Sequence, residues 1–196
     1  MEDKEQFFSV SGIPVKGIYT PEDVKDVDYD KDIGIAGEPP FTRGVYASMY
    51  RGRLWTIRRL SGFNTPEEAN ELFRQEYELG QTGFSLAPDI STPSGMDCDD
   101  PRVAADVGHS GVPLSSLQDM ETTFEGLPID KVSTYLADRF GSIVTAMYFV
   151  MAEKRGIDIK QLRGTTPTDM CTWSSMYLFN QVPPRAILRY AVDFIE

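Results

Sequence analysis

The densest group of chemically useful side chains is a run of arginines and aromatic residues over Tyr46–Arg59. It places four arginines within nine residues, at positions 51, 53, 58 and 59, in a chain whose formal net charge is −11. Guanidinium groups pair with phosphate oxygens through two hydrogen bonds at once, and neighbouring aromatic rings stack on purines. The run therefore indicates a site for a phosphorylated ligand. A solvated basic edge that pairs with the acidic stretch 26–32 is the alternative interpretation.

The remaining reactive side chains do not form a pattern typical of a catalytic or metal site. The acidic stretch 97–100 could hold a hard cation, but a polar, capped loop is the interpretation we favour. The only histidine, His109, has no acid or nucleophile at a defined spacing. Cys98 and Cys171 lie far apart in the sequence and are predicted to remain reduced. We therefore predict no catalytic residue and no metal ligand.

Charge and hydropathy exclude several classes of partner. An acidic surface repels phosphate backbones and anionic lipid heads, so neither nucleic acid nor a membrane surface is expected. No stretch approaches the roughly 20 apolar residues that span a bilayer. The charged start of the chain is not typical of a secretory signal. These features predict a cytoplasmic protein.

Strands and helices alternate from Trp55 onward. The predicted strands are Trp55–Ser61, Gly83–Ala87, Lys131–Ala137 and Leu162–Thr166. Helices are predicted after the capping residues Thr65 and Ser115, over Phe140–Lys154, around Met170–Met176 and over Ile187–Ile195. Residues 1–45 have little periodicity beyond a helical turn at Thr20–Asp23. They are predicted to form an extended arm that lies on the domain or on a partner.

This alternation predicts an α/β fold with a parallel sheet and right-handed crossovers. The sheet is either a small doubly wound sheet or part of a (β/α)8 TIM barrel. The partial barrel, of about four βα units over residues 46–196, is favoured because one face of each strand carries hydroxyls or arginine. No glycine-rich dinucleotide motif follows any strand. A half barrel has two open edges, so we expect a homo-oligomer or a partner chain.

Several long strings of residues carry a resemblance to one family. They are Val10–Pro14, Tyr19–Asp23, Gly37–Tyr46, Met49–Arg58, Gly80–Gly83, Asp99–Pro101, Asp119–Met120, Gly126–Ser133 and Gln161–Thr165. In these strings the chain resembles the N-terminal part of the large, substrate-binding chain of the methylmalonyl-CoA mutase family, the adenosylcobalamin-dependent acyl-CoA mutases.

The resemblance implies a barrel in which CoA threads the axis past small hydroxyl side chains. It implies that Tyr46, Ser48, Met49 and Arg53 contact the CoA or acyl group, and that Ser85 lines the channel. By the same resemblance, adenosylcobalamin would be carried by a partner chain that also holds the back half of the barrel. The cobalamin-ligating Asp-x-His-x-x-Gly motif of the family is not found in this sequence.

Several positions depart from the family pattern. Leu60 stands where the family has a tyrosine near cobalamin and substrate. Other residues that would line the channel or recognise the substrate are replaced by Tyr135, Ala137, Arg139, Pro167 and Tyr177. Tyr177 stands in place of an arginine that pairs with the substrate carboxylate, so recognition of a dicarboxylic acyl group should be lost.

We therefore expect a component of a methylmalonyl-CoA mutase-type isomerase. It would supply the half of the barrel through which CoA enters, and it would be inactive alone. The alternatives are a non-catalytic module that binds acyl-CoA or a mutase as a scaffold or regulator, and a degenerate remnant.

Overall fold

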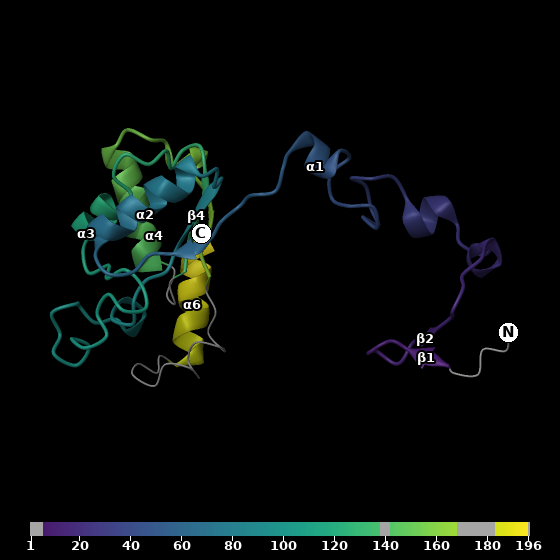
Figure 1. Cartoon of the computed structure of the whole chain (residues 1–196), viewed down its shortest axis with the longest axis horizontal. Coiled ribbons are helices and arrows are strands. Elements are labelled where there is room, and N and C mark those ends of the chain that lie inside the picture. Colours follow the sequence, from purple (N-terminus) through teal and green to yellow (C-terminus); the bar gives the residue numbers. More distant parts are fainter. Residues whose placement is uncertain (1–5, 138–141, 168–182, 196) are drawn as a thin grey trace. The chain divides into compact units, whose positions relative to one another are not determined.

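The computed structural model describes residues 6–137, 142–167 and 183–195 (Figure 1). The chain divides into two compact units, Met1–Trp55 and Thr56–Glu196. The predicted helix around Met170–Met176 lies outside the described residues. The predicted boundary after residue 45 stays a prediction.

The first unit is built from short elements. They are an antiparallel hairpin of β1 (Phe7–Phe8) and β2 (Pro14–Val15), the turns η1 (Pro21–Val24) and η2 (Tyr29–Ile33), and the short helix α1 (Met49–Gly52). The predicted helical turn is confirmed as η1, where the Thr20 backbone N–H donates to the Asp23 carboxylate at 2.7 Å. No apolar side chain in the described part of this unit is buried. The described part of this unit therefore has no hydrophobic core of its own.

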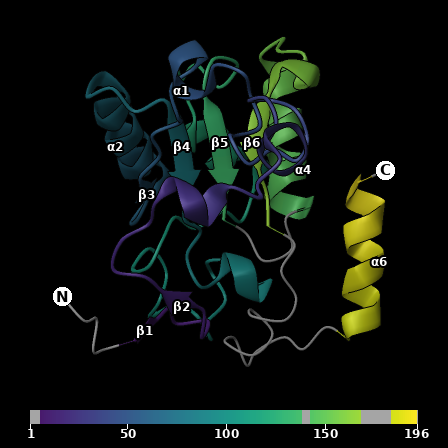
Figure 2. The same ribbon diagram turned by 90° about the vertical axis from the view of Figure 1, so that its right-hand side faces the viewer.

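A four-stranded parallel sheet forms the centre of the second unit. Its strands are β3 (Leu60–Ser61), β4 (Gly83–Leu86), β5 (Ser133–Leu136) and β6 (Arg163–Thr165). They lie side by side in sequence order, as Figure 2 shows. The α/β class and all four predicted strands are confirmed. The described strands form an open sheet with β3 and β6 at its edges, so the partial barrel stays a prediction.

The first strand is much shorter than the predicted Trp55–Ser61. Upstream of Leu60, backbone N–H groups donate to side-chain oxygens instead of to the backbone carbonyls of a regular strand pair. The Ile57 N–H donates to the Thr82 hydroxyl at 2.8 Å, and the Arg59 N–H donates to the Gln81 side-chain oxygen. The chain therefore follows its neighbour without completing a regular ladder.

Three helices cover one face of the sheet. They are α2 (Pro66–Glu78), α3 (Leu117–Thr123) and α4 (Ser142–Lys154), and Figure 1 shows them on the same side of the strands. Short 3-10 turns η3 (Thr92–Ser94) and η4 (Ile159–Gln161) lie in the connections, and α6 (Pro184–Ile195) follows β6. No helix in the described part of the chain is long and apolar enough to cross a membrane.

Capping residues set the starts of α2 and α3. Thr65 caps α2 as predicted, because its hydroxyl accepts from the Glu68 N–H and Pro66 occupies the first helical position. The predicted cap of the second helix was wrong by one residue. Ser116, not Ser115, accepts from the Asp119 N–H, and the Asp119 carboxylate accepts from the Ser116 N–H at 2.8 Å.

The core lies between the sheet and the three helices. Phe73 on α2, Phe84 on β4 and Phe124 at the end of α3 are fully buried, with ring centroids 5.3–6.2 Å apart. Tyr148 on α4 meets Phe124 edge to face at 5.3 Å. Aromatic contacts of this kind add to the stabilisation from burial.

Two helices expose apolar residues that the sequence pattern placed on inner faces. Ile143 and Val150 of α4 are exposed, whereas Val144 and Met151 are buried. The broad apolar surface of α4 is therefore covered on one side only. On α6, Leu188 is exposed although it belongs to the predicted stripe.

Candidate functional site

Four of the five predicted ligand-contacting residues gather around α1. Ser48 precedes the helix, Met49 begins it, and the Arg53 N–H closes it by donating to the Met49 carbonyl at 3.2 Å. Tyr46 lies two residues before Ser48, and all four side chains are exposed. The structure thus presents an aromatic ring, a hydroxyl, a thioether and a guanidinium on one short segment.

Two glycines give this segment its shape. A Cβ at Gly44, where φ is +99°, would lie 2.6 Å from the Met49 sulfur. A Cβ at Gly52 would lie 2.2 Å from the Ser48 hydroxyl oxygen. Met49 itself has φ of 42°, a region that L-residues with side chains adopt rarely. Met49 and Ser48 therefore occupy space that only glycine leaves free.

The fifth predicted residue, Ser85, lies on β4 in the second unit and is buried. It belongs to the face of the sheet opposite the helices. Neighbouring residues Phe84 and Leu86 point into the core, and side chains alternate along a strand. The register places Ser85 in a row with Leu60, Tyr135 and Thr165, one residue from each strand. We call this side of the sheet the open face.

The open face also carries an arginine that lies across two strands. The Arg58 guanidinium carbon is 5.7 Å from the centroid of the Tyr135 ring, which is the distance of a cation–π contact. Its stem crosses Gly83, where a Cβ would lie 2.6 Å from Arg58 Cγ. Sequence reasoning did not single out this contact. The alternation of side chains along residues 58–60 indicated that Arg58 and Leu60 share a face. The contact with Tyr135 could not be predicted, because it depends on how β3, β4 and β5 pair.

Positions that depart from the family pattern meet on this face as well. Leu60 and Tyr135 flank Ser85 directly in the row across the sheet. Ala137 follows β5 and Pro167 follows β6, while Arg139 and Tyr177 lie outside the described residues. Two bulky side chains therefore stand on either side of the predicted channel residue.

The long loop after β4 is organised by a buried carboxylate. Asp89 is fully buried and accepts from the Ser91 hydroxyl at 2.6 Å and from the Gly108 N–H at 3.0 Å. His109, next to Gly108, is exposed. The paired hydrogen bonds from Arg102 hold the pKa of the Asp100 carboxyl at about 2. No three described His, Cys, Asp or Glu side chains are placed to bind a metal ion together.

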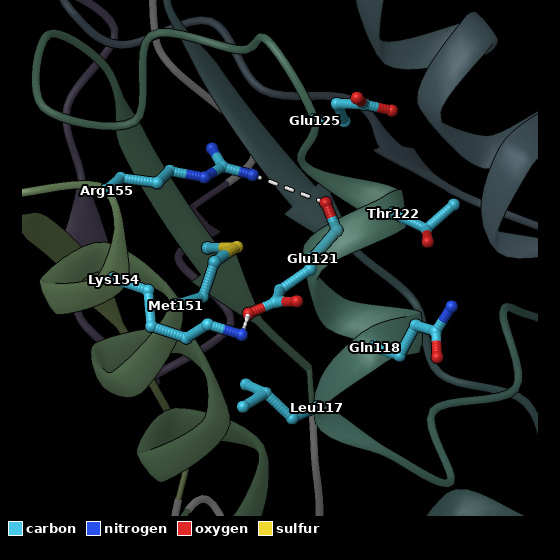
Figure 3. A pocket seen from close by; sticks show the side chains of 8 residues that line it. All are labelled: Leu117, Gln118, Glu121, Thr122, Glu125, Met151, Lys154 and Arg155. Atoms are coloured by element: carbon cyan, nitrogen blue, oxygen red, sulfur yellow. Dashed lines mark hydrogen bonds and ion pairs between the residues drawn. The ribbon is translucent and has the colours of Figure 1, made fainter.

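A groove of about 620 Å³ lies between α3 and α4, on the side away from the sheet (Figure 3). Lys154 forms an ion pair with Glu121, and Arg155 donates to the Glu121 carbonyl oxygen at 3.3 Å. Met151 lies fully buried beneath them. Burial lowers the pKa of Arg155. Lys154 and Glu121 in this groove are therefore paired with each other, whereas Arg155 is held by a backbone carbonyl.

A smaller cavity, of about 240 Å³, lies between α4 and β6 beside Thr134, Tyr148 and Leu162. Neither this cavity nor the groove includes any of the five predicted ligand-contacting residues. The predicted ligand-contacting residues therefore form two separate groups, the exposed α1 segment of the first unit and the buried Ser85 on the open face of the second.

Fold and surfaces define an α/β domain whose parallel sheet presents hydroxyl and arginine side chains on one face. The chain matches the model of the methylmalonyl-CoA mutase family over residues 8–196, and it belongs to that family.

Curated relatives agree with this assignment. The methylmalonyl-CoA mutase of Cereibacter sphaeroides is 38% identical over 189 residues, which cover 96% of this chain and 26% of the relative. The large subunit of the 2-hydroxyisobutanoyl-CoA mutase of Aquincola tertiaricarbonis is 40% identical over 170 residues, which cover 86% of this chain and 30% of the relative. The human mitochondrial methylmalonyl-CoA mutase is 35% identical over 189 residues, which cover 94% of this chain and 24% of the relative. The chain thus spans less than a third of the length of these relatives.

The described residues do not fit adenosylcobalamin, the cofactor that the resemblance implies. Its family motif relies on a histidine ligand, and His109, the only histidine of the chain, is exposed on the loop after β4. The groove and the cavity contain no imidazole, and no metal-binding group was found among the described side chains.

Proposed function

We propose that this chain forms the acyl-CoA-binding part of a methylmalonyl-CoA mutase-type isomerase. It supplies the half of a β/α barrel through which CoA enters, and it is not active alone. Family membership supports the reaction class. Two of the relatives, from Aquincola tertiaricarbonis and from Propionibacterium freudenreichii, are named as large subunits, which supports an assembly of more than one chain.

The observation that carries the proposal is the row across the open face. Ser85, Tyr135 and Thr165 bring three hydroxyl groups side by side on β4, β5 and β6. Parallel strands in sequence order, with their helices on one side, are the arrangement from which a TIM barrel closes. In a closed barrel this face would become the interior, and its hydroxyls would line a channel for a polar chain such as pantetheine.

The α1 segment also supports binding of a phosphorylated ligand. Arg53 offers a guanidinium fork for a phosphate group, and Tyr46 offers a ring for stacking. Arg51 and Arg53 have no carboxylate partner among the described residues, so the predicted pairing with residues 26–32 is not observed for these two. Two exposed and unpaired guanidinium groups favour ligand binding over a neutralised basic edge.

Edges β3 and β6 need a partner to complete such a barrel. We propose either a second copy of the chain or a mutase chain that holds the back half of the barrel and the cobalamin domain. We further propose that the assembly is cytoplasmic.

A second candidate function is a non-catalytic module that binds acyl-CoA or a mutase. Leu60 and Tyr135, on both sides of Ser85, favour it. These bulky side chains stand where the family pattern has residues that contact cofactor and substrate. A surface that keeps the CoA-contacting segment but fills the reaction space would bind without turnover.

Isothermal titration of the full chain with CoA and with methylmalonyl-CoA tests the proposal, together with its mass in solution. We expect saturable binding that Arg53→Ala weakens at least tenfold, whereas Arg185→Ala, with the same loss of charge at an exposed position of α6, leaves it within about twofold. Equal affinities of both variants and the wild type would rule out the α1 segment as the CoA site. Turnover on adding a cobalamin-bearing mutase chain separates the catalytic component from the binding module.

A further inference from the structure

The layer between α4 and β6 contains several buried hydroxyl groups. The cavity of about 240 Å³ lies in this layer, on the helix side of the sheet. Thr134, Thr145 and Tyr148 line it, and only 2%, 4% and 3% of their surfaces are exposed. The layer between β4, α2 and α3 is filled instead by phenylalanine rings. Buried hydroxyls in place of apolar side chains indicate a role other than packing.

Gly164 on β6 keeps part of this cavity open. It lines the cavity and pairs in register with Thr134 on β5. Thr134 faces α4, because its hydroxyl bonds to Tyr148, so position 164 lies on the same side of the sheet. A Cβ at Gly164 would lie 2.4 Å from the Thr134 carbonyl oxygen. A residue with a side chain therefore does not fit there, and the space beside Thr134 stays unfilled.

The hydroxyls of Thr134 and Tyr148 leave one hydrogen-bond donor unused. Their oxygen atoms lie 2.8 Å apart, so one of their two protons lies in the bond between them. The other O–H has no acceptor among the described residues, whichever of the two hydroxyls carries it. A buried donor without an acceptor lowers stability, and a bound molecule that accepts from it removes this cost.

The other walls of the cavity are mainly apolar. Phe149 and Ile159 line it with 38% and 41% of their surfaces exposed, so they lie at its mouth. Leu136, which is 4% exposed, lines its buried part. Arg163 is the only residue with a charged side chain among those that line the cavity, and it is exposed. An ion in the buried part would therefore lose its hydration without gaining a partner of opposite charge.

The volume sets the size of a molecule that fits. A cavity of about 150 Å³ admits benzene, so 240 Å³ admits a ring of this size with a small substituent. Ordered water requires two to four polar partners for each molecule. The Thr134–Tyr148 pair offers such partners, but Phe149 and Leu136 do not. An organic molecule with one polar atom therefore matches the walls better than water alone.

We propose that this cavity binds a small uncharged molecule with an apolar body and one hydroxyl or carbonyl group, whose oxygen bonds to the Thr134–Tyr148 pair. The site lies on the opposite side of the sheet from the open face, and it includes none of the five residues predicted to contact CoA. A molecule bound there joins α4 to β6, the edge strand whose three residues are all exposed.

NMR titration of the full chain with phenol and with toluene tests the site. The two probes have the same number of non-hydrogen atoms and differ in one hydroxyl. We expect saturable shifts of the Leu162 and Gly164 amides, and about fivefold tighter binding of phenol. Tyr148→Phe should bring the affinity for phenol to within about twofold of that for toluene. Tyr77→Phe loses the same hydroxyl from a side chain that is 40% exposed on α2, and it should keep the wild-type preference.

A second variant shows where the probes bind. Leu162→Phe adds a ring to the cavity wall and should abolish binding of both probes, while thermal melts verify that the variant is folded. Equal affinities of the wild type for phenol and toluene would overturn the proposal, as would phenol binding that Leu162→Phe leaves intact. Tighter binding of benzoate than of phenol would show an anion site at Arg163 instead.

Failure of both probes to bind saturably would show that the cavity holds only water or is covered by another surface, and it would also overturn the proposal. The acyl-CoA proposal is scored separately. Tyr148→Phe should bind CoA like the wild type, because Tyr148 faces the helix side of the sheet. Arg53→Ala should leave phenol binding unchanged, because α1 belongs to the other unit.

Discussion

The hydroxyl groups of Thr134 and Tyr148 lie 2.8 Å apart and join strand β5 to helix α4 inside the core. Both side chains are buried, with 2% and 3% of their surface exposed. Burial raises the pKa of Tyr148 to about 12, although its hydrogen bond with Thr134 acts in the opposite direction. The phenol of Tyr148 therefore keeps its proton in the folded protein at pH values where an exposed tyrosine has lost it.

This difference makes the stability of the protein sensitive to alkali. An unfolded tyrosine ionises near pH 10 and Tyr148 in the folded chain near pH 12, so its contribution is complete below pH 10 and is lost as the pH rises towards 12. Chemical denaturation of wild type and Tyr148→Phe from pH 8 to 12 should show a steeper loss for the wild type, of the order of 2 kcal/mol. Tyr50→Phe, at an exposed position, serves as the control. Parallel pH profiles for Tyr148→Phe and wild type would contradict the assignment.

Phe124 connects the aromatic rings of the core to α4. It is fully buried and contacts Phe73, Phe84 and Tyr148. Replacing it with alanine removes these contacts and leaves a cavity, so Phe124→Ala should lower the free energy of unfolding by about 3–5 kcal/mol. Leu79→Ala, at a side chain that is 87% exposed, should change it by less than about 0.5 kcal/mol. Urea denaturation of both variants measures the difference. A similar loss of unfolding free energy in both would show that Phe124 does not belong to the core.

The start of α3 can be tested with two adjacent serines. Ser116→Ala removes the hydroxyl that accepts from the Asp119 N–H and should cost about 1 kcal/mol. Ser115 instead accepts from the Cys98 N–H at 3.0 Å in the preceding loop. Ser115→Ala should therefore speed amide exchange at Cys98 and leave exchange at Asp119 unchanged, while Ser116→Ala does the reverse. Hydrogen exchange followed by NMR resolves the two sites, and a reversed pattern would restore Ser115 as the cap.

Asp89 is expected to control the order of the loop after β4. Its carboxylate accepts from the Ser91 hydroxyl, the Thr92 N–H and the Gly108 N–H. Asp89→Ala leaves these donors without their acceptor, which should cost at least about 2 kcal/mol. Exchange of the Gly108 amide should accelerate strongly. Asp106→Ala, at an exposed side chain of the same loop, should leave it unaltered, and an unchanged Gly108 amide in Asp89→Ala would show that the loop is ordered by other contacts.

Alternation of apolar runs with capped helices was enough to predict the sheet and its helices. All four strands were predicted at the right places in the chain, because turn residues bound each of them and a helical segment separates each from the next. The extent of β3 was not predictable from Trp55–Ser61, because its shortening depends on the Gln81 and Thr82 side chains, which are distant in sequence. The cap of α3 was missed because Ser115, with Gln118 three residues later, also fits a capping box in the sequence. Only Ser116 has an acid three residues later that closes a capping box.

The candidate site was predictable in composition but not in arrangement. Tyr46, Ser48, Met49 and Arg53 lie close together in the sequence, and a short segment keeps them close in space. Arg58 and Tyr135 are far apart in the sequence, and only the pairing of the strands brings them into contact. Closure of the sheet into a barrel stays a prediction, because the described strands form an open sheet.

The absence of buried apolar side chains from the described part of the first unit has a calorimetric consequence. The heat capacity change of unfolding comes from apolar surface that becomes hydrated, at about 12–15 cal/mol/K per residue in a protein with an ordinary core. Thr56–Glu196 contains 196 − 55 = 141 residues. We expect a value of about 1.9 kcal/mol/K, set by this unit alone, instead of the roughly 2.6 kcal/mol/K of a fully cored chain of this length. The heat capacity change should rise towards the higher value when another surface covers the first 55 residues.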